Sequence, residues 1–117
     1  MDTRNKVEKH QNILTKYLES LAADYNAMPN IKLEYQAIAD KERGHFQLVK
    51  LGWLDRQYVH MVLLHFDVKP DGKVWIQLYD TEKLVGQELM DLGIDKNDLV
   101  LGFKPAYMRP FTGFATA

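Results

Sequence analysis

Three histidines and an aspartate lie where neighbouring strands would bring imidazole and carboxylate groups together: His45, His60, His65 and Asp67. His65 and Asp67 are two residues apart, so on a strand their side chains point to the same face. The odd separations of His60 from both predict that it points to the opposite face. If the strand of His45 pairs alongside, His45, His65 and Asp67 gather on one face and form either a metal or acid–base site or a set of hydrogen-bonded strand histidines. We favour the second interpretation, because most strand histidines are structural.

The other reactive side chains fit structural roles better than catalytic ones. Asp80 and Glu82 flank Thr81 at the expected start of a helix, where carboxylates cap free amides and complement the helix dipole. Ser20 is the only serine and lies in a helical pattern with no nucleophile-elbow motif. The chain has no cysteine, which excludes disulfides and thiolate zinc sites. We therefore predict no catalytic residue, no metal and no cofactor.

The C-terminal stretch from Leu99 to Ala117 is rich in aromatic residues and contains no acid. A loose terminus is usually polar, so this stretch must either pack on its own domain or cover a partner. Basic and aromatic residues alternate in it: Lys104, Tyr107, Arg109, Phe111 and Phe114.

Three interpretations of this stretch stay open. In the first, Phe103, Phe111 and Phe114 complete the core and Arg109 pairs with an internal acid. In the second, its Tyr, Phe, Met and Arg side chains form a protein interface, where these residue types are enriched. In the third, aromatic rings stack on bases while the cations follow phosphates.

Composition sets limits on the class of protein. The 117 residues suit a single domain spanning residues 1–117. Fifteen basic residues against sixteen acidic ones, a net charge of −1, argue against DNA binding by the chain alone. The charged N-terminus lacks the apolar core of a secretory signal, and no apolar run approaches the roughly 18 residues that span a bilayer. We expect a cytoplasmic protein.

Apolar periodicity predicts a helix, four strands, a second helix and an irregular apolar end. The expected ranges are 3 to about 24 for the first helix, 31–37, 45–53, 58–68 and 73–79 for the strands, and 82–92 for the second helix. The fold class is therefore α+β: an antiparallel β-meander with an N-terminal helix and a second helix packed on the sheet. After Leu99 we expect turns and one short strand.

Several details follow from the same pattern. The strand at 58–68 is the most apolar and belongs at the centre of the sheet, and Pro70-Asp71-Gly72 is a turn between antiparallel strands. Within 45–53 the alternation slips, which indicates a bulge or burial on both faces. Four apolar residues of the second helix are expected to face inward: Leu84, Val85, Leu89 and Leu92.

Four segments, taken in order and at their spacing, resemble the small cyanobacterial XisI-like proteins, described as fdxN element excision controlling factors. They are DKERGHFQLVKLGW at 40–53, HFDVKPDGKVWIQ at 65–77, TEKLVGQE at 81–88 and GIDKNDLVLGFKPAYMRPFTGFA at 93–115. The family often has Tyr after the histidine of the second strand, where this chain has Phe46. That change weakens any proposal that position 46 hydrogen-bonds a ligand.

The resemblance implies an accessory role in the programmed excision of a DNA element during heterocyst differentiation, with a separate recombinase cutting the DNA. It also implies a protein partner, such as an XisH-type protein or the recombinase machinery. From the residues we expect Arg43, Trp53, Tyr107, Arg109 and Phe111 to contact that partner, with a homo-oligomer as a further outcome. DNA binding by the C-terminal stretch is the alternative, and an enzyme using His45, His65 and Asp67 is the least favoured.

Overall fold

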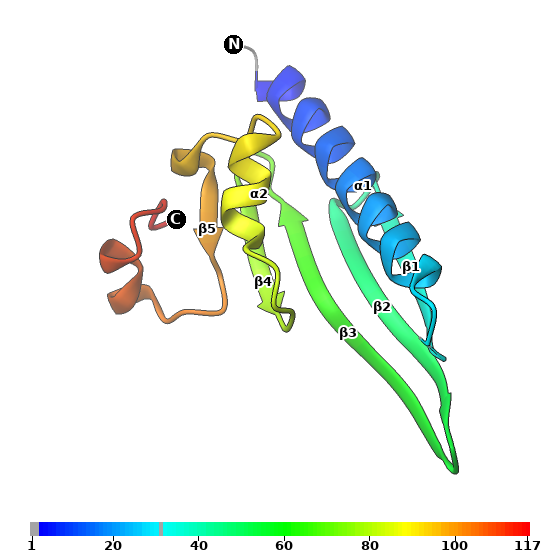
Figure 1. Cartoon of the computed structure of the whole chain (residues 1–117). Helices are drawn as coiled ribbons and strands as arrows, with labels where there is room; N and C mark the ends of the chain where they lie inside the picture. The colour runs from blue at the N-terminus through cyan, green and yellow to red at the C-terminus, as the bar shows by residue number, and fades with distance from the viewer. Residues whose placement is uncertain (1–2, 31) are drawn as a thin grey trace.

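The computed structural model describes residues 3–30 and 32–117 as two helices against one five-stranded sheet (Figure 1). The strands lie in the order β1-β2-β3-β4-β5. The elements are α1 (Thr3–Ala27), β1 (Glu34–Asp40), β2 (His45–Leu54), β3 (Gln57–Val68), β4 (Val74–Tyr79), α2 (Val85–Asp91), a 3-10 turn at Lys96–Asp98, β5 (Leu99–Leu101) and a 3-10 turn at Ala106–Phe111. The predicted α+β class is confirmed, and Ile31, expected to begin the first strand, lies outside the described residues.

Both helices cover the same face of the sheet, as predicted. Residues three and four apart on α1, including Leu14, Leu18 and Leu21, are buried against the sheet, which is the spacing of one helical face. Phe46 of β2 and Phe66 of β3 are fully buried beneath them. Position 46 is therefore a core position in this chain.

A buried histidine ties α1 to the turn between β3 and β4. The Nδ1 atom of His10 lies 2.6 Å from the carbonyl oxygen of Gly72, to which it donates. Burial lowers the pKa of His10 below its ordinary value, because the charged imidazolium would lose its hydration there.

Strands β1 to β4 form the predicted antiparallel meander, with β3 at its centre. Strand β2 alternates without interruption, and its predicted slip reflects burial on both faces, because the neighbours Leu48 and Val49 are both buried. A register shift lies opposite: Leu48 pairs with Leu64, but Val49 pairs with Val62. The extra residue, Leu63, is on β3, and Leu63 and Leu64 both belong to the core. This is a β-bulge, placed on the partner of the strand in which the pattern slipped.

The bulge corrects the prediction for His60. His60 pairs with Leu51, and directly paired residues lie on the same face. Leu51 is six residues from His45 on β2, an even separation, so both are on the face away from the helices. His60 thus shares the face of His45 and His65, because the extra residue in β3 reverses the alternation, but it lies farther along the strand.

The fifth strand is parallel to β4, which the antiparallel prediction did not include. Val74 pairs with Leu99 and Ile76 with Leu101. Parallel neighbours need a crossover connection, and α2 supplies it on the helix-covered face (Figure 1). The short strand expected after Leu99 is therefore present as β5, the end of a β4–α2–β5 crossover.

The second helix is shorter than predicted. It begins at Val85, with Leu84 as an N-cap that makes no side-chain capping bond, so the expected capping by Asp80 and Glu82 is wrong. Glu82 instead accepts a hydrogen bond from the Tyr25 hydroxyl at 2.9 Å. Val85 and Leu89 are buried as expected, because residues four apart share one helical face. Leu84 and Leu92 are exposed, because they lie outside the seven-residue helix as its N-cap and C-cap.

None of the helices within the described residues combines the length and the apolar character that a bilayer crossing requires.

Candidate functional site

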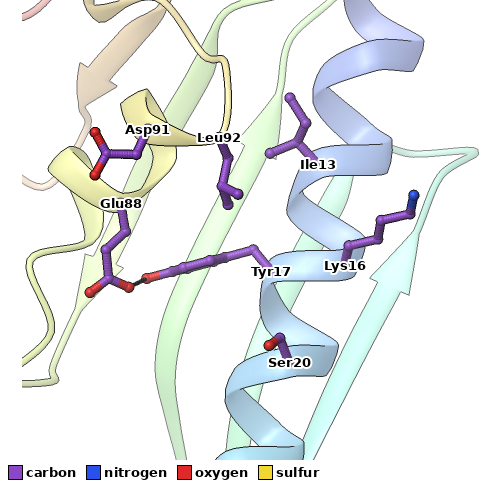
Figure 2. A pocket seen from close by; sticks show the side chains of 7 residues that line it. All are labelled: Ile13, Lys16, Tyr17, Ser20, Glu88, Asp91 and Leu92. Carbon is purple, nitrogen blue, oxygen red and sulfur yellow. Dashed lines mark hydrogen bonds between the residues drawn. The ribbon is translucent and has the colours of Figure 1, made fainter.

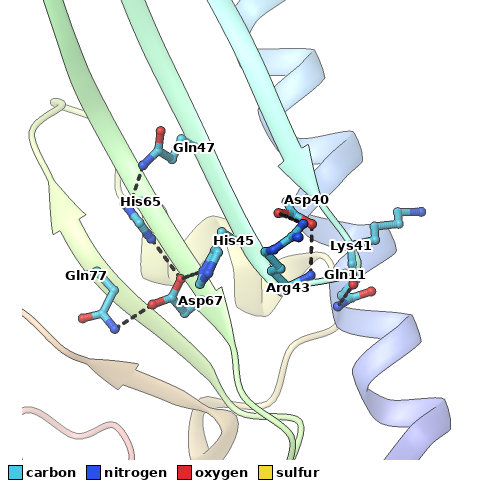
Figure 3. Close-up of polar contacts among 9 residues, drawn as sticks. All are labelled: Gln11, Asp40, Lys41, Arg43, His45, Gln47, His65, Asp67 and Gln77. Carbon is cyan, nitrogen blue, oxygen red and sulfur yellow. Dashed lines mark hydrogen bonds and ion pairs between the residues drawn. The ribbon is translucent and has the colours of Figure 1, made fainter.

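Two imidazoles and a carboxylate meet on the sheet face that the helices leave open (Figure 3). We call His45, His65 and Asp67 the imidazole–carboxylate cluster. His45 pairs with Asp67 across β2 and β3, and Gln47 pairs with His65, so all four side chains project from the same face. The Oδ1 atom of Asp67 accepts from His45 Nδ1 at 2.7 Å and from His65 Nε2 at 2.9 Å. The expectation that these three residues gather is therefore correct.

Two glutamines complete this network. Gln47 Nε2 lies 2.9 Å from His65 Nδ1, and Gln77 Nε2 donates to the second oxygen of Asp67 at 3.0 Å. Burial opposes the ionised form of Asp67, but the hydrogen bonds from both histidines and Gln77 outweigh it and hold the pKa of Asp67 below its ordinary value. Asp67 is therefore a carboxylate at neutral pH, surrounded by donors.

The C-terminal segment, which we define as residues 102–117, wraps around the β5 edge of the sheet. Ala115 pairs with Val100, and its amide donates to the Leu99 carbonyl oxygen at 2.9 Å. On the helix-covered side, Phe114 packs against the core. The segment therefore covers an edge that would otherwise present unpaired backbone groups.

On the open face, Arg109 fastens the same segment. Its guanidinium lies 4.9 Å from the centre of the Trp75 ring, and Nε donates to the Lys104 carbonyl oxygen at 3.1 Å. A further bond reaches the Thr116 carbonyl oxygen at 3.4 Å. The interpretation in which Arg109 pairs with an internal acid is wrong, because its partners are an aromatic ring and backbone carbonyls.

The aromatic residues of the C-terminal segment divide into packed and exposed ones. Phe114 packs against the core, and Phe103 contacts Tyr79 edge-on at 6.3 Å between ring centres. Tyr107 is 76% exposed and Phe111 is 86% exposed. Core completion thus accounts for Phe114 and part of Phe103, but it leaves two rings in water on an anchored segment.

The five residues expected to contact a partner lie in three places. Tyr107, Arg109 and Phe111 share the 3-10 turn at Ala106–Phe111. Arg43 is in the turn before β2, where it forms ion pairs with Asp40 and Glu42. Trp53 is near the far end of β2. An extended strand rises about 3.3 Å per residue, so Trp53 lies on the order of 30 Å from Arg43. They are therefore not one continuous surface, and their role in binding stays a prediction.

A second exposed apolar cluster lies at the tip of the long β2–β3 hairpin, which extends beyond the rest of the sheet (Figure 1). Trp53 is 62% exposed there and contacts Tyr58 edge-on at 5.1 Å between ring centres. Leu54 is exposed beside them. The sequence indicated only Trp53, although Tyr58 follows the same two-residue turn at 55–56, so its position across the hairpin could have been predicted.

Sequence reasoning missed a groove between the two helices (Figure 2). It has a volume of about 600 Å³ and is lined by Ile13, Lys16, Tyr17, Ser20, Glu88, Asp91 and Leu92. The Tyr17 hydroxyl donates to Glu88 at 2.8 Å, and burial together with Glu88 raises the pKa of Tyr17 above its ordinary value. Tyr17 therefore stays protonated and acts as a hydrogen-bond donor in the groove wall.

These features define a class: a small α+β protein with one sheet face covered by helices, an imidazole–carboxylate cluster on the open face and a C-terminal segment that presents aromatic rings. The XisI family model, described as XisI protein, matches residues 1–116, and this chain therefore belongs to the XisI family. The resemblance seen in the sequence is confirmed. Among curated proteins, none matches the chain.

Two solved structures have the same fold. A XisI-like protein from Anabaena variabilis is 33% identical, with a TM-score of 0.84 over 95% of this chain and 99% of that chain. The fdxN element excision controlling factor XisI from the same organism is 24% identical, with a TM-score of 0.79 over 96% of this chain and 99% of that chain. The second likeness shows the fold alone.

Proposed function

We propose that this XisI-family protein is an accessory factor in the controlled excision of a DNA element, the fdxN element of heterocyst-forming cyanobacteria. It acts by contacting a protein partner and catalyses no reaction itself. Family membership supports the process, and one solved relative is described as an excision controlling factor. The partner is an XisH-type protein or a component of the recombinase machinery.

The observation that carries the mechanism is the exposure of Tyr107 and Phe111 on a segment whose backbone is already fixed. Isolated apolar side chains on a surface are ordinary, but here two large rings lie on one turn, at 76% and 86% exposure. Tyr is enriched among residues that dominate binding energy. Because Arg109 and the Ala115–Leu99 hydrogen bond hold the segment in place, a partner would not have to order it, which lowers the cost of binding.

The contacts proposed for Arg43 and Trp53 belong to separate surfaces. Trp53 lies with Tyr58 and Leu54 at the hairpin tip, and Arg43 lies in a groove beside Lys41 and Lys69. Residues of α1 also line that groove, so a partner that touches all three places would have to extend beyond the open face. A second copy of this chain is a further candidate occupant of the hairpin tip, since Trp53 and Tyr58 are exposed there.

The test measures the affinity of the purified chain for the XisH-type protein. Tyr107→Ala/Phe111→Ala should weaken binding about 30-fold or more, which corresponds to the roughly 2 kcal/mol of a binding hot spot. Leu84→Ala is the matched control, because Leu84 is also exposed but lies before α2, and its affinity should be unchanged. Failure of the wild-type chain to bind, or equal affinity of the double variant, would contradict the proposal.

Direct DNA binding is the weaker candidate. The C-terminal segment carries two cations, and Arg109 is occupied by Trp75 and backbone carbonyls, which leaves Lys104 to contact phosphates. Affinity for DNA that falls steeply as salt increases would favour this candidate. We expect no measurable binding at about 50 mM salt, where electrostatic binding is strong.

A further inference from the structure

We propose that the imidazole–carboxylate cluster binds a divalent transition-metal ion of the zinc class through His45, His65 and Asp67. The inference is independent of the proposed excision role, because it rests on the donor atoms of β2 and β3 alone. Figure 3 shows the three side chains pointing toward one another on the open face of the sheet.

The donor set is the one that such ions select. Imidazole nitrogens and a carboxylate oxygen are ligands for zinc and its neighbours, whereas calcium and magnesium prefer oxygen alone. One ligand atom from each residue lies within 4.8 Å of the other two. Bonds of about 2.0–2.2 Å to a shared ion place tetrahedral ligands about 3.3–3.6 Å apart. The two histidine–aspartate distances of 2.7 and 2.9 Å must therefore open by about half an ångström, which side-chain rotation supplies.

The protons of the cluster can move out of the way of an ion. Each imidazole now donates to Asp67 and must instead present a lone pair. His45 has a half-exposed side chain, so its proton can move to Nε2 and be hydrated. The Nδ1 atom of His65 lies 2.9 Å from the Gln47 amide, and rotation of that amide offers its oxygen as an acceptor. Gln47 would then hold the His65 ring as the outer partners of metal-bound histidines do.

The charge and the hydrogen bonds of the Asp67 carboxylate suit it to bind a cation. Gln77 donates to one oxygen of Asp67, which leaves the other oxygen facing both imidazoles. Within residues 3–30 and 32–117, Asp67 forms ion pairs with those two imidazoles and with no lysine or arginine. With neutral imidazoles the cluster therefore carries a negative charge and attracts a cation.

Three protein ligands leave one coordination position open. Closed structural zinc sites have four protein ligands, whereas open ones hold a water or another donor in the fourth position. Here the opening lies on the side of His45, whose side chain is 54% exposed. The ion would link β2 to β3 and present an exchangeable position to solvent or to a donor from another molecule.

The experiment titrates the metal-free chain with Zn²⁺ against a chromogenic chelator. One ion should bind per chain, and His45→Gln or His65→Gln should abolish stoichiometric binding. His60→Gln is the matched control, because His60 is on the same strand and face as His65 but outside the cluster, and its affinity should equal that of the wild type. Co²⁺ provides a second readout, since its visible absorption reports a four-coordinate site that contains nitrogen.

Substitutions of Gln47, which faces His65 Nδ1, give a second test of the site. Gln47→Leu keeps all three ligands but removes the group facing His65 Nδ1, and it should lower affinity about 10- to 100-fold. Gln47→Glu, which restores an acceptor, should recover it. The proposal is overturned if the wild-type chain binds no stoichiometric ion, or if His60→Gln reduces binding as much as His65→Gln does.

Discussion

The two faces of the sheet differ in what their side chains do. On the helix-covered face, Phe46, Phe66 and Ile76 are fully buried in one apolar core. On the open face, polar side chains bond one another across strands, and Arg109 fastens the C-terminal segment over Trp75. The first face accounts for stability. The second carries exposed groups that stability does not require, and we expect function there.

The largest effect should come from the helix-covered face. Phe66→Ala removes a fully buried ring and should lower the free energy of unfolding by about 3–5 kcal/mol. Urea denaturation followed by circular dichroism measures this loss. A loss below about 1 kcal/mol, typical of surface changes, would contradict the contrast between the two faces.

Loosening the C-terminal segment should have a smaller, local effect. Arg109→Ala removes the contact with Trp75 and the bonds to the carbonyl oxygens of Lys104 and Thr116, and should cost about 1–2 kcal/mol. Amide hydrogen exchange should quicken at Thr112 and Ala115, whose hydrogen bonds close the segment, but not in α1. Arg109→Lys is the control that keeps the charge and loses the planar stacking group. Exchange that quickens equally throughout the chain would show that Arg109 supports the whole fold.

Acid should act through His10 on the helix-covered face. Its pKa in the folded state lies below 6.5, because burial outweighs the carbonyl of Gly72 and the charge of Asp98, with Lys9 and Lys6 adding to the decrease. On acidification, His10 of the unfolded chain therefore takes up a proton before His10 of the folded chain does. The contribution of neutral His10 to the free energy of unfolding is complete above pH 6.5. It is lost as the pH falls from there toward the folded-state pKa. Unfolding free energies from about pH 8 to about pH 5 should fall more steeply in the wild type than in His10→Gln. Equal slopes in the two proteins would show that His10 does not contribute to the loss of stability in acid.

The smallest effect on stability belongs to the exposed rings. Tyr107→Ala and Phe111→Ala should each change the free energy of unfolding by at most about 0.5 kcal/mol, because both rings are largely in water. Thermal denaturation measures it. Losses above about 2 kcal/mol would mean that these rings support the fold, and the comparison between the two faces would fail.

The meander was predictable because alternation of period two marks the buried face of each strand. The gathering of His65 with Asp67 followed from the same period, and His45 joined them through strand pairing. His60 was misplaced because a bulge reverses alternation without leaving a local signature at Leu63. The sequence of one strand shows which of its residues share a face, but it does not show where pairing with a neighbouring strand leaves an extra residue.

Contacts between distant segments were less visible. The parallel pairing of β5 depends on a crossover helix and involves only three residues, too few for a pattern. The bond between Tyr17 and Glu88 joins residues 71 positions apart. Composition could not show which C-terminal aromatic residues pack, because the burial of Phe114 and the exposure of Phe111 depend on the path of the segment at the β5 edge.

The most direct test of the proposed partner-binding C-terminal segment is hydrogen exchange of the chain, free and in complex with the XisH-type protein. The account predicts that amides of residues 102–117 gain protection in the complex while those of α1 do not change. No gain in the C-terminal segment, or protection confined to the helix-covered face, would contradict it.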